Sequence, residues 1–163
     1  MQGIDQQVAA AYHVAGRAVA CALRGWTQGW VTLDEAQMWP HARAEALPFV
    51  DYAGVWASAR RRGDLAGEPG VSEDRFAAAM SAHPDDACAV GVAQLEVATA
   101  LTAAGQSDVW GWLPGVTAAW RAELEQMWPV VQHVAVLLLA GRVVSAQRVR
   151  RLADDRLLSG LAV

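Results

Sequence analysis

A histidine and an arginine, four residues apart, form part of a narrow polar strip on a predicted helix near the start of the sequence. At ~100° per residue, His13 and Arg17 point in nearly the same direction as Gln6 and Arg24, and the other positions from 8 to 23 are Ala, Val, Gly, Leu, Cys or Tyr. A helix that is apolar around most of its circumference is usually central, so this strip faces either water or a pocket. In a pocket, Arg17 would bind a carboxylate, sulfate or phosphate, and His13 would transfer a proton near neutral pH.

Two adjacent carboxylates, Asp85 and Asp86, follow Pro84 at the predicted start of a later helix. The helix dipole favours acids in a first turn, which explains both residues without any function. In a pocket shared with the first helix, Asp86 would act with His13 as a catalytic proton carrier, and Asp85 would act with Arg17 in binding a substrate.

Four segments of the chain, in order, resemble the peptidase domain of the FtsH-type zinc metallopeptidases. The segment Ala11–Val19 is similar to that family's Ala-x-His-Glu-Ala-Gly-His-Ala-Val helix, and this is the specific part of the match. Tyr52–Ala57 resembles a Leu-Ala-Gly-x-Ala-Ala segment, and Trp128–Leu152 resembles the C-terminal helix pair. His83–Ala87 resembles the Ser-x-Asp loop, which implies that Asp86 occupies the position of the third zinc ligand, with Asp85 as the near alternative.

The sequence departs from that family at the residues that perform its chemistry. Two histidines four residues apart hold zinc from one helical face, and the glutamate between them is the general base. Here only His13 is kept, Val14 stands at the base position and Arg17 stands at the second ligand position. Arginine is always cationic and offers no lone pair, so it cannot ligate zinc. Ser58 also stands where the family usually has glutamate, so a conventional zinc protease is not expected.

We expect an arginine to replace the missing metal ion. A carboxylate at Asp86 would be buried and uncompensated without a cation, and the guanidinium of Arg17 could pair with it, with His13 beside the pair. Three interpretations of the strip stay open: a solvated face, a purely structural ion pair, or a site for an anionic ligand. A rebuilt zinc site that uses His13, Asp86 and Cys88 is a further alternative.

Composition excludes several function classes. All 13 cationic side chains are arginine, so a Walker-type phosphate loop and a Schiff-base lysine are absent. The net charge of −4 and the lack of a long basic run give nucleic-acid binding no support, and no apolar stretch is long enough to span a bilayer. Cys21 and Cys88 do not form a disulfide framework and are expected to be small buried residues. With no secretion signal evident, we expect a cytoplasmic protein.

The periodicity predicts one mainly helical domain over residues 1–163. The predicted helices span residues 5–24, 42–62, 72–83, 84–104, 116–140 and 145–158, with at most one short strand or hairpin near 26–40. Residues 106–115 are expected to form a turn-rich link, and Pro129 should kink or split the fifth helix.

Eight tryptophans are the main oddity of the composition. Trp56, Trp120 and Trp128 have the spacing of core positions on helices. Trp110 and Trp112 are expected to anchor a connection onto the core. An interface is expected to use some of the remaining loop tryptophans, namely Trp26, Trp30 and Trp39.

The resemblance and its departures together favour a non-proteolytic, metal-free derivative of the peptidase scaffold, with no cofactor. Because the 163 residues contain neither the membrane anchor nor the ATPase module of the full proteases, we expect a small-molecule enzyme of specialised metabolism, or a subunit of a heteromeric one. The alternative is a non-catalytic pseudoprotease that binds a homologous protein partner. A residual zinc metallohydrolase with rebuilt ligands is the second alternative.

Overall fold

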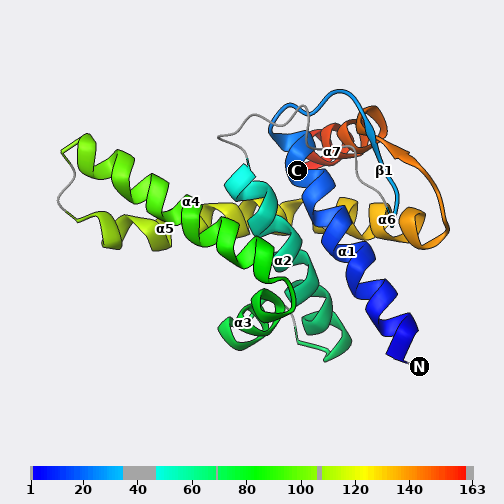
Figure 1. Cartoon of the computed structure of the whole chain (residues 1–163). Coiled ribbons are helices and arrows are strands. Elements are labelled where there is room, and N and C mark those ends of the chain that lie inside the picture. Colours follow the sequence, from blue (N-terminus) through cyan, green and yellow to red (C-terminus); the bar gives the residue numbers. More distant parts are fainter. Residues whose placement is uncertain (1, 35–46, 69, 106–107, 161–163) are drawn as a thin grey trace.

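The computed structural model describes residues 2–34, 47–68, 70–105 and 108–160, most of which are helical (Figure 1). The helices are α1 Gln2–Leu23, α2 Leu47–Leu65, α3 Glu73–Ala82, α4 Pro84–Ala103, α5 Val109–Gln126, α6 Trp128–Leu139 and α7 Ala146–Gly160. The strands β1 Trp30–Val31 and β2 Val144–Ser145 pair in antiparallel register, with Trp30 opposite Ser145. The expected mainly α fold is confirmed, and none of the helices among the described residues is long and apolar enough to cross a bilayer.

Helix α1 packs against α2 at very short range because small residues face each other. A Cβ atom added to Gly16 would lie 2.5 Å from the carbonyl oxygen of Ala53 and 2.7 Å from the Cβ atom of Ala57. Carbon atoms in contact normally stay ~3.5–4.0 Å apart, so the position accepts only glycine at this helix separation. Helices α6 and α7 cover other parts of α1, which makes α1 the central helix, as its apolar circumference predicts (Figure 1).

The main core lies among α1, α2, α6 and α7, and aromatic side chains fill much of it. Trp56 and Trp128 are 1% and 6% exposed, and their rings meet edge to face with centroids 5.6 Å apart. Trp120 is partly buried and packs against the same cluster. These three tryptophans were expected in the core, and the structure confirms that placement.

The chain leaves α1 through a turn that directs Trp26 inward. Gly25 has a φ of +90°, its N–H donates to the carbonyl of Ala22, and the N–H of Trp26 donates to the carbonyl of Cys21. This pair of bonds is a Schellman motif, which favours glycine at the left-handed position. Trp26 is 1% exposed, so it belongs to the core and not to an interface. Trp30 is partly exposed and Trp39 lies outside the described residues, so an interface that uses either of them stays a prediction.

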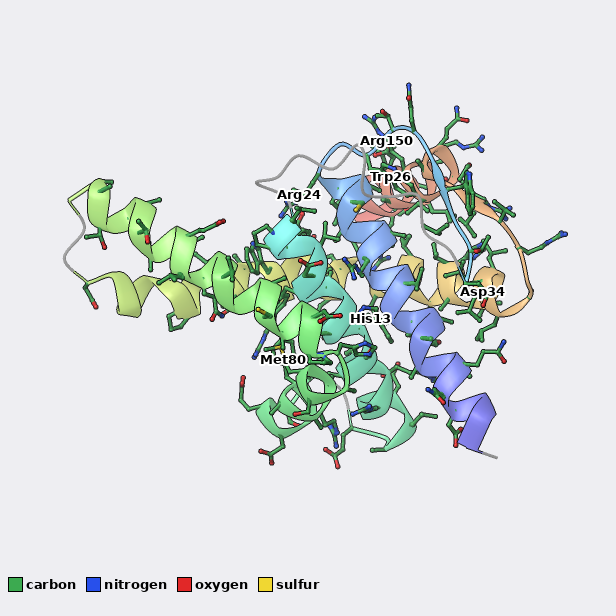
Figure 2. All side chains as sticks on the ribbon, in the orientation of Figure 1. His13, Arg24, Trp26, Asp34, Met80 and Arg150 are labelled. Carbon is green, nitrogen blue, oxygen red and sulfur yellow. The ribbon has the colours of Figure 1, made fainter. Side chains whose placement is uncertain are left out.

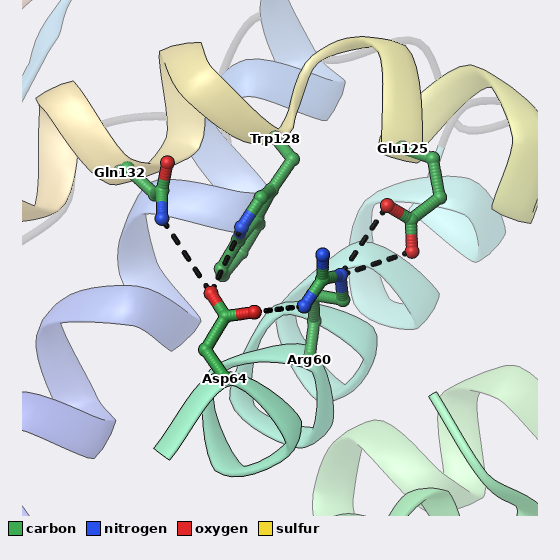
Figure 3. A network of polar contacts seen from close by, with 5 residues as sticks. All are labelled: Arg60, Asp64, Glu125, Trp128 and Gln132. Carbon is green, nitrogen blue, oxygen red and sulfur yellow. Dashed lines mark hydrogen bonds and ion pairs between the residues drawn. The ribbon is translucent and has the colours of Figure 1, made fainter. Parts of the chain in front are cut away.

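A polar network holds the end of α2 against α5 and α6 (Figure 3). The carboxylate of Asp64 accepts hydrogen bonds from Trp128 Nε1 at 3.1 Å and from Gln132 Nε2 at 3.5 Å, and it pairs with Arg60. Arg60 also donates from Nε to Glu125 at 3.1 Å. One carboxylate therefore satisfies the indole N–H of a core tryptophan and fixes the arginine that reaches the neighbouring helix.

Helices α4 and α5 run side by side, and their connected ends extend beyond the other elements, while α4 also packs against α2 and α3 (Figure 1). Helix α5 begins at Val109 and contains Pro114, so the prediction of a turn-rich link is wrong over residues 109–115, whereas residues 106 and 107 lie outside the described part. Pro114 removes one backbone donor, and the helix continues beyond it. The split at Pro129 is confirmed, because α6 begins at Trp128 and proline costs little in a first turn. Residues 42–46 and the side chains of Trp110 and Trp112 lie outside the described part.

Substitution of Gly16 by alanine tests the close approach of α1 and α2. Gly16→Ala should lower the free energy of unfolding by about 1–3 kcal/mol, because the added methyl group must push the helices apart. Gly91→Ala is the matched control, since Gly91 is exposed within α4 and an added Cβ meets nothing within 4 Å. The free energy of unfolding of the control should rise by up to about 1 kcal/mol, because alanine has a higher helix propensity than glycine. Equal stability of the two variants in urea denaturation would contradict the close approach.

Candidate functional site

His13 and Arg17 lie one helical turn apart on α1 and face α2, at the glycine of the Tyr52–Ala57 segment. A Cβ atom added to Gly54 would lie 2.6 Å from Cε1 of His13 and 2.8 Å from Cγ of Arg17. The missing side chain at position 54 therefore makes the room that both polar side chains occupy. His13 is 8% exposed, so the interpretation of the strip as a solvated face is wrong at this position.

The carboxylate that the structure places on Arg17 belongs to Asp51. Arg17 Nη2 donates to Asp51 Oδ1 at 2.7 Å, and the two side chains are 19% and 11% exposed. Asp51 precedes Gly54 by one turn of α2, so both residues present the same face to α1. Sequence analysis missed Asp51, although it is the only charged residue between Glu45 and Arg60 and is therefore conspicuous within an apolar helix.

The expected bridge between Arg17 and Asp86 stays a prediction. The backbone of Asp86 belongs to the first turn of α4, as expected, but its side chain lies outside the described part of the chain. The structure shows a different carboxylate, that of Asp51, paired with Arg17.

A second imidazole, from His83, lies against the first. The rings of His13 and His83 are stacked, with centroids 4.0 Å apart and planes inclined by 16°. His83 is the residue before α4, and its side chain makes no capping hydrogen bond to that helix. Figure 2 shows His13 on the side of α1 that faces this junction between α3 and α4. His83 was not predicted as a site residue, because the contact depends on how the helices pack.

These side chains line a small open pocket of about 280 Å³. The lining residues are His13, Arg17, Ala82, His83, Pro84 and Asp85. The structure therefore brings together three of the four predicted site residues, from helices that are far apart in sequence. Asp85 is exposed at the pocket edge, at the start of α4.

The described side chains do not fit a zinc ion. An imidazole binds zinc ~2.0–2.1 Å from its nitrogen, along a lone pair in the ring plane. Because the rings of His13 and His83 are stacked and nearly parallel, their lone pairs do not converge on one ion. Arg17 adds a permanent positive charge beside them. Among the described residues, no group of three or more His, Cys, Asp or Glu side chains is placed to hold a metal ion.

Ser58 lies one turn beyond Gly54 on the same face of α2, where the resembled family usually has glutamate. The side chain is buried, with 3% of the residue exposed, and Oγ has no hydrogen-bond partner among the described residues. A hydroxyl is smaller than a carboxylate and carries no charge, so this position adds no ligand or base.

Comparisons of the chain with models of known protein families, with curated proteins and with solved structures give no match. The resemblance to FtsH-type peptidases therefore stays a prediction that depends on the motif residues quoted above.

A double-mutant cycle measures the coupling between the charged partners of this site. Arg17→Ala should cost roughly 2–4 kcal/mol of unfolding free energy, because it leaves the mostly buried Asp51 carboxylate without its cation. The double variant Arg17→Ala/Asp51→Ala should lose less unfolding free energy than the two single variants lose in total. The difference should be at least about 1 kcal/mol.

The exposed pair Arg150–Asp154, whose atoms are 4.0 Å apart, is the control for that cycle. Its coupling should stay below about 0.5 kcal/mol, because water screens the charges. If the two cycles gave the same coupling energy, the Arg17–Asp51 pair would have no special place in the structure.

The two cysteines differ in environment, which gives a chemical test of the site's packing. Cys21 is buried one turn after Arg17, and burial raises the pKa of its thiol to about 12, although Arg17 opposes the rise. Cys88 is exposed, so the expectation that it is buried is wrong. The folded protein should therefore react rapidly with an aromatic disulfide reagent at Cys88 alone, because the Cys21 thiol stays protonated and covered. Cys88→Ser should remove the fast phase, and rapid reaction of both thiols in the folded state would contradict this packing.

Proposed function

We propose that this chain is a non-proteolytic, metal-free derivative of a zinc-peptidase scaffold. Its His13/Arg17 pocket would bind a small anionic ligand, as the substrate site of a small-molecule enzyme or of one subunit of such an enzyme. The observation that carries the proposal is the pocket in which Arg17, paired with Asp51, lies beside the stacked imidazoles of His13 and His83.

Arg17 supplies the charge for ligand binding. Its guanidinium is planar and permanently cationic, and its donors match a carboxylate or a phosphate. The ion pair with Asp51 orients the group, so a ligand would meet an arginine whose position is already fixed. Preorganisation of this kind reduces the entropy lost on binding.

The remaining walls of the pocket support the same ligand class. The pocket lies at the start of the 20-residue helix α4, where backbone dipoles favour negative charge. His13 and His83 place imidazole ring nitrogens in the pocket wall, and an imidazole can donate a hydrogen bond to a bound molecule or accept one from it. Asp85 at the pocket edge would accept a hydrogen bond from the ligand, so the preferred ligand carries a hydroxyl or an ammonium group next to its acid group.

Titration of the full chain with glycolate, acetate and inorganic phosphate tests the proposal. Arg17→Gln combined with Asp51→Asn keeps a neutral hydrogen-bonded pair and should weaken binding at least about tenfold, because a charge-assisted contact is lost. Arg150→Gln combined with Asp154→Asn is the matched control, since it removes an exposed ion pair and, like the test variant, leaves the net charge unchanged. Glycolate should bind more tightly than acetate if Asp85 accepts from its hydroxyl.

Calorimetry gives the affinities, and imidazole resonances of His13 and His83 should shift on binding. Unchanged affinity in the double variant, or no binding of any of the three anions at tens of millimolar, would contradict the proposed site.

A second candidate is a non-catalytic subunit that binds a homologous protein, and the paired helices α4 and α5 favour it. Val92 and Leu95 on α4 are 50% and 60% exposed, and Glu96 is the only charged residue from 87 to 103. Large apolar side chains on a projecting helix often mark a protein interface. Native mass spectrometry of protein from its own host would give a stoichiometric complex in this case, and a monomer otherwise.

We further propose that the chain acts in the cytoplasm, which agrees with two cysteines that form no disulfide. A zinc hydrolase with rebuilt ligands is the least supported candidate, because Arg17 places a permanent positive charge beside His13, where the ion would have to bind.

A further inference from the structure

A second pocket, of about 530 Å³, lies where α2, α3, α4 and α5 meet. It is lined by Tyr52, Glu73, Phe76, Gln94, Pro114, Thr117, Ala118 and Arg121. Its volume falls within the ~300–1,000 Å³ that small-molecule sites usually have. None of its lining residues belongs to the His13/Arg17 pocket, so it is a separate candidate site.

The base of this pocket holds a buried hydroxyl with a proton to donate. Tyr52 is 1% exposed, and its hydroxyl oxygen accepts a hydrogen bond from Arg121 Nε at 2.8 Å. Among the described residues, no acceptor takes the proton of that hydroxyl. Burial raises the pKa of Tyr52, so the phenol keeps its proton at neutral pH. A ligand oxygen in the pocket could therefore accept from it.

Arg121 adds a cation at the same place, held by a partner that a ligand can replace. Its Nη1 donates to Glu73 at 2.8 Å, and the Glu73 side chain is 80% exposed. Exposed ion pairs contribute little free energy, so exchange of Glu73 for another carboxylate costs little. Arg121 also lies over the ring of Phe76, with Cζ 5.6 Å from the centroid, which limits its orientations.

The remaining surface is apolar and partly aromatic. The rings of Tyr52 and Phe76 have centroids 5.0 Å apart, and Pro114 and Ala118 add carbon atoms from α5. An aromatic wall next to one cation and one hydroxyl donor suits a flat apolar molecule with a single acid group.

We propose that this pocket binds a small aromatic or similarly flat carboxylic acid. One carboxylate oxygen accepts from the Tyr52 hydroxyl, the carboxylate replaces Glu73 on Arg121, and the apolar body lies against Phe76. The recognition does not depend on the His13/Arg17 site.

Phenylacetate is the test probe, with the neutral 2-phenylethanol as its comparison, in calorimetric titrations of the full chain. Tyr52→Phe keeps the ring and should weaken phenylacetate binding about fivefold, because one hydrogen bond is lost. Glu73→Gln should instead tighten binding severalfold, since it removes the competing carboxylate. Asp74→Asn is the matched control, because it removes an adjacent exposed acid of the same helical turn and should leave the affinity within about twofold.

The Arg17→Gln/Asp51→Asn variant separates the two sites, because it should leave unchanged the phenylacetate binding that Tyr52→Phe weakens and Glu73→Gln strengthens. Two results together support the proposal. The chain should bind 2-phenylethanol more weakly than phenylacetate, and Tyr52→Phe and Glu73→Gln should change the phenylacetate affinity in opposite directions. Absence of phenylacetate binding at tens of millimolar, or affinities that neither substitution changes, would overturn it. Loss of binding only in the Arg17→Gln/Asp51→Asn variant would also overturn it, by assigning the carboxylate to the other pocket.

Discussion

The close contact between α1 and α2 determines where His13, Arg17 and Asp51 of the candidate site lie. Two glycines permit it, one from each helix: Gly16 faces the backbone of Ala53, and Gly54 faces His13 and Arg17. Side chains at these positions would separate the helices, and the separation would move Arg17 away from Asp51. The position of the Arg17–Asp51 ion pair therefore depends on the small residues at positions 16 and 54.

Within that contact lies the ion pair of Arg17 and Asp51, and in the function that we propose this pair takes the place of the metal ion of the peptidases that the motifs resemble. A permanent cation at Arg17 cannot dissociate, in contrast to a bound ion, and its charge does not depend on metal supply. The carboxylate of Asp51 comes from the partner helix, so the pair also links α1 to α2. The same contact thus serves both the fold and the pocket.

The sequence predicts the elements of this arrangement better than their contacts. Helical periodicity places His13 and Arg17 on one face and predicts that α1 is central, because both follow from residues close together in the chain. Asp51 and His83 were missed, since each meets α1 only after helices distant in sequence have packed. The start of α5 was also misjudged, because Gly and Pro near residue 114 favour a turn locally, whereas the helix begins at Val109 and continues through Pro114.

A crystal structure of the protein grown with excess zinc, with anomalous data collected at the zinc edge, would show whether an ion pair or a metal ion occupies the site. We expect Arg17 to remain within hydrogen-bonding distance of Asp51, His13 and His83 to remain stacked, and His13 to bind no zinc. A well-occupied zinc ion coordinated by His13, with Arg17 displaced from Asp51, would contradict this expectation.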